Sequence, residues 1–305
     1  MGPDGSFSRA EAFERNRGLV SIPEQEKLAN SLVVIAGCGG VGGLHAHTLA
    51  RLGIGRFRVT DPDGFSVANF NRQIGATVDT VGRNKAEVTA KMIHSINPDA
   101  SVEIMSEPVS SHNANRFIKD SNLIVDGLDF FALDARRELF SVARTSEIPV
   151  ITAAPLGFSA TLHVFAKGGM SFDAYFDLRD DQDRFDQLVS FFVGLAPKGL
   201  HLPYMDLSTV NIATGRGPSS IVGCQLAACL IGTEAVRILT GKGPSRLAPD
   251  YLQFDTYRQM IAKGRLSHGN RNWMQRLKRR IVKNRLQSLG LDRVLASAKP
   301  DVSKA

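Results

Sequence analysis

A glycine-rich loop that follows a short apolar run constrains this chain more than any other feature. The run at 31–36 (SLVVIA) is followed by Gly37, Gly39 and Gly42 in the pattern G-x-G-x-x-G, and a helical stretch at 43–52 comes next. The first glycine of such a loop allows a tight turn, the second lets the backbone approach a phosphate, and the third lets helix and strand pack closely. The N-terminus of the helix adds N–H donors and positive potential. The loop therefore predicts a nucleotide-binding α/β domain.

The rest of the first half alternates apolar runs with helical spacing, and this alternation predicts a doubly wound, mainly parallel, Rossmann-like sheet. Beyond Ala154 the alternation stops, and two further runs predict an antiparallel C-terminal extension. We expect strands at 31–36, 56–61, 100–105, 123–126, 149–153, 161–165 and 250–255, helices at 43–52, 84–96, 113–120, 133–144 and 218–239, and a loop with short helices at 173–186.

We expect three parts along the chain. Residues 1–30 are predicted to form a helical arm. Residues 31–255 are predicted to form the main domain, with a nucleotide half at 31–154 and a substrate-side half at 155–255. The remainder, 256–305, is a tail with thirteen Lys and Arg and two acids in a chain of net charge +7, so the first 255 residues are net acidic.

The tail contains a predicted basic amphipathic helix at 267–290. Its pattern is compatible with docking on the body or on a dimer mate. Its charge is also compatible with a nucleic-acid contact, for instance tRNA. A third use is a membrane-surface contact with Trp273 as the anchor.

Cysteine content and hydropathy favour a cytoplasmic protein. Cys38, Cys224 and Cys229 are too few for a disulfide framework. We expect Cys38 to pack under the glycine loop and the other two to be buried on an apolar helix. With no pair of C-x-x-C motifs, no structural zinc is expected. The N-terminus lacks a secretory signal, and no apolar run reaches the roughly 18–20 residues that span a bilayer, so no integral membrane association is expected.

The glycine loop alone does not identify its nucleotide. Asp61 ends the second predicted strand, where an acid can accept from ribose hydroxyls, and this fits NAD, FAD, S-adenosylmethionine or ATP. Asn69, Arg72 and Lys85 follow it and suit a triphosphate, although a single basic residue is more often a solvated surface group. Asp129 follows the fourth predicted strand, where a carboxylate is a natural Mg²⁺ ligand beside a triphosphate. The set therefore favours Mg·ATP.

Five motifs follow one another along the chain: GCGGVGG at 37–43, D-x-D at 61–63, N-x-N-R-Q at 69–73, G-x-x-K at 82–85 and D-x-x-D at 126–129. Together and in this order they resemble the motifs of the ThiF/MoeB/HesA family, whose fold is shared with ubiquitin-activating enzymes.

The resemblance implies roles for individual residues. It implies that Gly40 lies under the phosphates together with the other loop glycines, that Asp61 holds the ribose, and that Asp129 orders magnesium. Asn69, Arg72 and Lys85 are implied to hold the triphosphate, and Asp63 is a further nucleotide-binding candidate. Arg17, with Arg15 as the alternative, matches a family arginine that reaches the γ-phosphate across a homodimer interface.

The resemblance implies an ATP-dependent adenylyltransferase in which Arg72, Lys85, Asp129 and Arg17 act in catalysis. The expected substrate is the C-terminus of a ubiquitin-like or sulfur-carrier protein, or a peptide. No cysteine lies between Asp129 and Gly223, so we expect no enzyme thioester.

Three alternatives stay open. The run at 71–74 (NRQI) also resembles the tRNA threonylcarbamoyladenosine dehydratases. An NAD-dependent oxidoreductase would use the loop and Asp61 but leave the later residues without a role. An inactive scaffold subunit is the third alternative.

Overall fold

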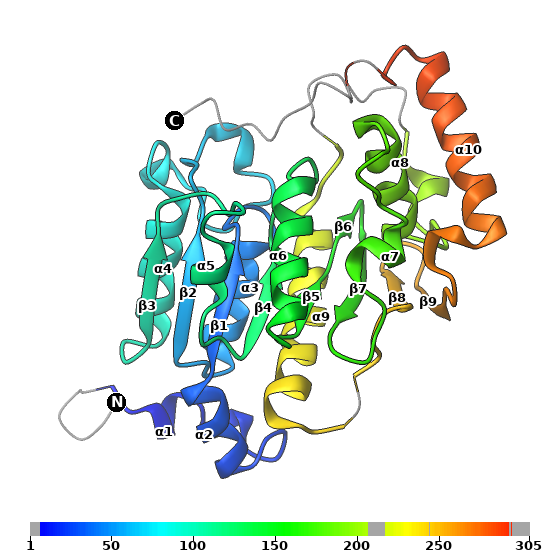
Figure 1. The fold of residues 1–305 in the computed structure, drawn as a ribbon. Helices are drawn as coiled ribbons and strands as arrows, with labels where there is room; N and C mark the ends of the chain where they lie inside the picture. Colours follow the sequence, from blue (N-terminus) through cyan, green and yellow to red (C-terminus); the bar gives the residue numbers. More distant parts are fainter. Residues whose placement is uncertain (1–6, 207–216, 244, 293, 295–305) are drawn as a thin grey trace.

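The computed structural model describes residues 7–206, 217–243, 245–292 and 294. Within them, nine strands form one sheet in the order β3-β2-β1-β4-β5-β7-β8-β9, with the short β6 paired to β7 (Figure 1). The strands are β1 (Leu32–Ala36), β2 (Arg56–Thr60), β3 (Ser101–Met105), β4 (Leu123–Asp126), β5 (Val150–Thr152), β6 (Pro155–Leu156), β7 (Ser159–Phe165), β8 (Asp250–Asp255) and β9 (Met260–Arg265).

Helices cover both faces of the sheet, as in a doubly wound fold (Figure 1). One face packs against α3, α4 and α9, and the other against α5 and α6, with α7, α8 and α10 beyond them. The helices are α1 (Arg9–Ala12), α2 (Ile22–Asn30), α3 (Gly42–Arg51), α4 (Lys85–Ile96), α5 (Ala114–Ile118), α6 (Leu133–Thr145), α7 (Phe172–Phe176), α8 (Arg184–Leu195), α9 (Ile221–Thr240) and α10 (Trp273–Ser288).

The parallel half of the sheet, β3-β2-β1-β4-β5, confirms the predicted fold class. Every residue of β1 is buried. Val34 faces the core under α5 and α6, whereas Val33 and Ile35 face the core under α3, α4 and α9. Because both faces are covered, β1 reads in the sequence as a continuous apolar run rather than an alternating one.

Beyond β5 the sheet becomes antiparallel and runs further than predicted. β7 pairs with β5 and β8, and β8 pairs with β9 over Met260–Arg265, inside the segment that we predicted as a basic helical tail. Most residues of β9 are exposed, so its hydrophobic pattern is weak. The region predicted as a loop with short helices contains α7 and then α8, which extends to Leu195.

Helix α9 corrects our expectation that no segment could match a membrane span. By length and composition Ile221–Thr240 is apolar enough to cross a bilayer. Its small residues let it pack as a core helix instead: Ala227, Ile231 and Ala235 are fully buried in the core that α3 and the sheet share. The apolar count from sequence underestimated this helix because Gly, Ala and Thr dilute its large side chains.

The N-terminal arm packs at the end of α3 that is remote from the glycine loop. Asn16 Nδ2 and Gln25 Nε2 both donate to the Leu52 carbonyl, at 3.4 and 2.9 Å. Figure 1 shows α1 and α2 at the lower end of the sheet. The arm is therefore fixed to the opposite edge from the carboxyl ends of the parallel strands.

Candidate functional site

Three glycines bring two neighbouring strand ends into backbone contact at the carboxyl edge of the sheet. A Cβ atom at Gly42 would lie 1.8 Å from the carbonyl oxygen of Gly37, and a Cβ at Gly37 would lie 2.4 Å from that of Gly127. Gly37 also has a φ of +90°, which L side chains rarely adopt. Larger residues would therefore push the loop away from the start of α3.

The middle of the loop is less crowded, because a Cβ there would meet only side chains, at ordinary contact distances. The nearest atom to a Cβ placed on Gly39 is Gln73 Nε2, at 3.8 Å. A Cβ on Gly40 would lie 3.7 Å from Arg72 Cγ. The loop thus presents backbone below the arginine and at the N-terminus of α3, where N–H groups favour an anion.

Asp61 links the end of β2 to this loop. Its Oδ2 accepts from the Cys38 N–H at 2.7 Å and its Oδ1 from the Asp63 N–H at 2.9 Å. Burial raises the pKa of the Asp61 carboxyl, opposed by the nearby Lys85 ammonium and by the two N–H donors. Each oxygen keeps a further lone pair, so the side chain can fix the loop and also accept from a ribose hydroxyl.

Lys85 is the first residue of α4 and its side chain is buried. Its Nζ lies 3.0 Å from Asp63 Oδ2, and its backbone N–H donates to the Asp63 carbonyl at 2.9 Å. The neighbouring Asn84 caps α4 and donates to the Asp61 carbonyl at 3.0 Å. A buried ammonium is thereby held near Asp61 by the Asp63 carboxylate, which is itself partly exposed.

Arg72 lies above Gly40 and belongs to a small polar cluster. Its Nη1 donates to the Ala68 carbonyl at 3.0 Å and to Asn71 Oδ1 at 2.9 Å. Asn71 Nδ2 in turn donates to the Ser219 carbonyl at 2.9 Å, just before α9. Asn69 is turned toward its own chain, where its Oδ1 accepts from the Ser66 N–H at 2.9 Å.

A buried ion pair shapes the loop that carries Asp129. Arg136 Nε lies 2.8 Å from Asp126 Oδ2, and both side chains are almost fully buried. The same guanidinium donates to the carbonyls of Leu128 and Asp129 at 2.6 and 3.1 Å. Sequence reasoning missed Arg136, although the sequence held a signal. The arginine occupies a buried position of α6 between Leu133 and Phe140, where only a partnered charge is tolerated.

Asp129 is the residue whose chemistry fits magnesium. Its carboxylate is exposed, and among the described residues only its Oδ1 has a donor, the Phe131 N–H at 2.9 Å. No group of three or more His, Cys, Asp and Glu gathers for a metal within the described residues. One carboxylate suffices where phosphates supply the other oxygens, as is usual for Mg²⁺. The residues present therefore fit magnesium bound together with a triphosphate.

Arg17 is not brought to the glycine loop of its own chain. It follows the arm segment that is hydrogen-bonded to Leu52, and α3 separates that end from Gly42 by about 15 Å. Its exposed guanidinium lies 3.6 Å from Glu14. A role for Arg17 at a triphosphate would thus require a second copy of the chain.

The cysteines follow the prediction in two cases and contradict it in the third. Cys38 and Cys224 are buried, and burial raises the pKa of both thiols. Cys229 is exposed, so our expectation for it was wrong. At about 100° per residue, five positions rotate the side chain to the opposite side of α9. Apolar neighbours in sequence do not bury a residue on the outward face of a helix.

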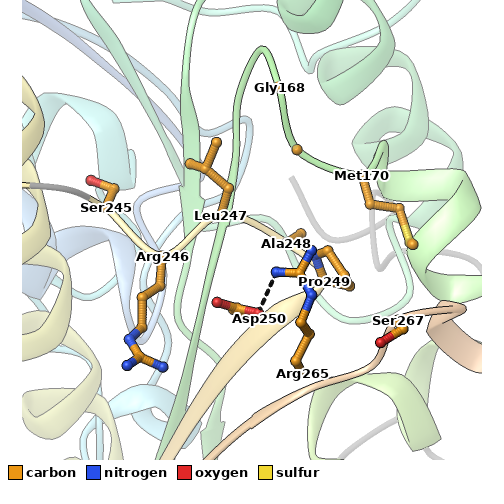
Figure 2. Close-up of a pocket in the computed structure, with 11 residues that line it drawn as sticks. Gly168, Met170, Ser245, Arg246, Leu247, Ala248, Pro249, Asp250, Arg265 and Ser267 are labelled. Atoms are coloured by element: carbon orange, nitrogen blue, oxygen red, sulfur yellow. Dashed lines mark hydrogen bonds and ion pairs between the residues drawn. The ribbon is translucent and has the colours of Figure 1, made fainter.

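A cavity in the described part of the chain lies away from this site. It has a volume of about 690 Å³ and is lined by residues 168–170, 245–250, 265 and 267. Figure 2 shows Arg265 and Asp250 at its wall, paired at 2.8 Å. These segments lie where β7 ends and β8 begins, opposite the carboxyl ends of the parallel strands. The cavity is therefore not part of the glycine-loop site.

Fold and site together define a Rossmann-like α/β protein whose glycine loop is surrounded by an arginine, a lysine and two strand ends that bear carboxylates. The ThiF family matches residues 13–273. The chain belongs to the ThiF family.

Two relatives of this chain carry names that state different activities. The chain is 29% identical over 256 residues to "Probable adenylyltransferase/sulfurtransferase MoeZ" of Mycobacterium tuberculosis, covering 80% of this chain and 58% of MoeZ. It is 35% identical over 130 residues to the tRNA threonylcarbamoyladenosine dehydratase of Escherichia coli, covering 42% and 48%. The chain thus spans about half the length of each of these relatives.

A similar fold is found in the crystal structure of E. coli MccB with ATP. Its TM-score is 0.65 at 18% identity, covering 88% of this chain and 72% of MccB. At this identity the likeness shows the fold.

Proposed function

We propose that this chain is an ATP-dependent adenylyltransferase. It activates a carboxylate, the C-terminus of a ubiquitin-like or sulfur-carrier protein or of a peptide, as an acyl-adenylate with release of pyrophosphate. Membership of the ThiF family supports the reaction class, and the names of relatives such as MoeZ support adenylyl transfer.

The observation that carries the proposal is the ring of charge around the glycine loop. Arg72 lies over Gly40, Lys85 is held near Asp61, and Asp129 follows Gly127, which touches the loop backbone. Arg72 and Lys85 follow β2 in the chain, and Asp129 follows β4. A dinucleotide cofactor would need the loop and Asp61 only, whereas a triphosphate also uses the two cations.

The reaction follows from these residues. An oxygen of the substrate carboxylate attacks the α-phosphorus of ATP, a new O–P bond forms, and the bond to the pyrophosphate oxygen breaks. No general base is needed, since a carboxylate is ionised near neutral pH. Arg72 and Lys85 offset the charge that develops on the leaving group, and the loop N–H groups orient the phosphates. Asp61 holds the ribose, with Asn69 and Asp63 as further nucleotide contacts.

Asp129 would hold the magnesium ion, which neutralises phosphate charge when it is bound. A thioester step is not part of the proposal. Cys38 and Cys224 have pKa values raised by burial, so neither is a ready thiolate. The acyl-adenylate would pass directly to an external nucleophile.

An aromatic cluster that is linked to Arg72 through Ser219 and Asn71 supports an extended protein or peptide substrate. The rings of Phe158 and Tyr257 stack with centroids 5.7 Å apart, and both are partly exposed. Gly157, next to Phe158, bridges Ser219, whose carbonyl accepts from Asn71 beside Arg72. An apolar segment of a substrate tail could pack here with its carboxylate at the loop.

ATP–pyrophosphate exchange in the presence of candidate small proteins and peptides tests the proposal. Lys85→Ala and Asp129→Ala should abolish exchange while the fold is retained. Lys91→Ala serves as the matched control, since Lys91 is an exposed lysine of the same helix. Wild-type exchange in both site variants would exclude the assignment. Thermal stabilisation by NAD instead of Mg·ATP would favour an oxidoreductase, and no exchange with any carboxylate would favour a scaffold subunit.

The identity to the E. coli dehydratase supports a second candidate, adenylylation of a carboxylate on tRNA. AMP formation that depends on threonylcarbamoylated tRNA, and not on any protein C-terminus, would select it. In either case Arg17 would act in a homodimer. Mixing Arg17→Ala chains with Lys85→Ala chains should then restore part of the activity, because each mixed dimer regains one complete site.

A further inference from the structure

Helix α10 packs on α8 through a side that combines polar and charged groups with Val282 and Leu286, which contact the core. Gln275 is buried and donates to Asn270 Oδ1 at 3.1 Å. Arg279 lies 2.8 Å from Asp177, and Lys283 pairs with Asp186. Figure 1 shows the helix at the outer edge of the molecule, beside α8. Arg279 and Lys283, on this side of the helix, are thus paired with carboxylates of the same chain.

A separate apolar stripe of α10 points outward. Trp273 is 71% exposed, Leu277 52% and Ile281 58%, and Met274 beside them is also exposed. At about 100° per residue these side chains span an arc of about 100° on the helix surface. A surface helix of a globular protein ordinarily turns such a stripe toward the core. Here the stripe is left without protein cover in the described part of the chain.

Arginines border this stripe on both sides. On the helical wheel Arg276 and Arg280 flank it on one side and Arg285 on the other. All three are exposed, and the structure shows no ion pair for them among the described residues. The sequence of α10 contains no acid. The outward face therefore combines large apolar side chains with uncompensated positive charge.

We propose that the outward face of α10 binds an anionic lipid bilayer peripherally. The apolar stripe would enter the boundary between headgroups and acyl chains, and the flanking arginines would reach the lipid phosphates. Charge complementarity favours anionic lipid, because each basic residue near such a surface adds to the attraction. A protruding helix is also readily reached by a flat surface (Figure 1). This contact goes beyond the proposed adenylylation and would hold that reaction at a membrane.

Two other partners fit this face less well. A second copy of the chain would bring two sets of uncompensated arginines together. A nucleic acid would pair with the arginines but leave Trp273, Leu277 and Ile281, at the centre of the face, without a matching surface. Both are distinguishable outcomes of the experiment below.

The experiment uses the full chain and its own reporter, because Trp273 is the only tryptophan. Vesicles of phosphatidylcholine alone are compared with vesicles of equal parts phosphatidylcholine and phosphatidylglycerol. Anionic vesicles should shift the Trp273 emission to the blue, and brominated acyl chains should quench it. Unchanged emission, or no flotation with anionic vesicles, would overturn the proposal.

Variants of α10 distinguish insertion of the apolar stripe into lipid from attraction by positive charge alone. Leu277→Ser with Ile281→Ser should weaken partitioning at least about tenfold, and Arg276→Gln with Arg280→Gln by about thirtyfold. Lys91→Gln with Lys119→Gln, two exposed lysines remote from α10, should leave it unchanged. Retained pyrophosphate exchange and an unchanged melting temperature show that the variants fold.

The same variants identify the other partners. Binding to tRNA that needs the arginines but not Leu277 and Ile281 would reassign the face to nucleic acid. Loss of a dimer in the apolar variant, without vesicle binding by the wild type, would reassign it to self-association.

Discussion

The two ends of the sheet are held together by different kinds of contact. In the parallel half, loops meet backbone to backbone: Gly37, Gly42 and Gly127 approach so closely that no side chain fits between them. In the antiparallel end, polar side chains mediate the contacts. Gln253 Nε2 donates to Ser159 Oγ at 3.2 Å and to His201 Nδ1 at 3.3 Å, and Tyr204 Oη donates to Asp255 at 3.0 Å.

This difference separates the two tasks of the proposed enzyme. Backbone contacts fix the glycine loop within a narrow tolerance, which phosphate alignment requires. Side-chain contacts are easier to change without loss of the sheet, which suits a surface that selects a substrate. Substitutions in the two ends should therefore differ in size and in kind.

The largest effect is expected for Arg136→Met in the parallel half. The change leaves Asp126 buried without its cation, and the free energy of unfolding should fall by about 3–5 kcal/mol. Urea denaturation measures the change. Combining it with Asp126→Asn should recover much of the loss, because the buried charge is then absent. A single variant within about 1 kcal/mol of wild type would mean that the pair does not organise this loop.

Gly42→Ala should lower the free energy of unfolding by about 3 kcal/mol, since the new Cβ would overlap the Gly37 carbonyl oxygen. Gly39→Ala is the matched control, because a Cβ at that position would meet only Gln73 Nε2, at an ordinary contact distance of 3.8 Å. The control should keep its stability and lose ATP affinity, which isothermal titration calorimetry measures. Equal stability of the two variants would refute the backbone-contact description of the loop.

The parallel half and the antiparallel end of the sheet also differ in how well they could be predicted from the sequence. The parallel strands were predicted to within one or two residues because apolar runs buried on both faces end abruptly at glycine or at Asp126. The loop's conformation was predictable for the same reason. Whether Arg72, Lys85 and Asp129 bind nucleotide stays a prediction.

The antiparallel end was harder to predict because its pairing depends on distant partners. Strand β9 is mostly exposed and lacks an apolar signal, so its place beside β8 is set by the ladder between Asp250 and Arg265 and not by local pattern. The exposure of Cys229 depends on which side of α9 meets α3. The partner of Arg136 lies ten residues away across a loop, which spacing alone does not reveal.

At the antiparallel end, we expect acid to lower the free energy of unfolding by about 2 kcal/mol through His201. Burial lowers the pKa of His201 to about 4, although Asp255 opposes the shift. In the unfolded state the pKa of a histidine is about 6.5. Between about pH 6.5 and about pH 4 the unfolded state therefore binds more protons than the folded state, so the free energy of unfolding falls as the pH falls. At about pH 5 the loss from His201 is about 2 kcal/mol.

His201→Gln should flatten this dependence, as measured by denaturation at a series of pH values. The exposed His112→Gln is the control and should follow the wild type. His45 and His163, whose pKa values burial lowers to about 3, keep part of the acid dependence in all three proteins. Parallel pH profiles for the wild type and His201→Gln would show that His201 does not titrate as a buried group.

The smallest effect is expected where α10 meets α8. Lys283 and Asp186 are each about one-third exposed, so Lys283→Gln should cost less than about 1 kcal/mol, and salt should reduce that cost further. Arg279→Gln should cost more, because Arg279 pairs with the buried Asp177 and also donates to Ser190 Oγ at 2.9 Å. Hydrogen exchange of the α10 amides measures both changes. Equal loss of protection in the two variants would mean that apolar packing, not this graded set of charges, holds the helix on the antiparallel end.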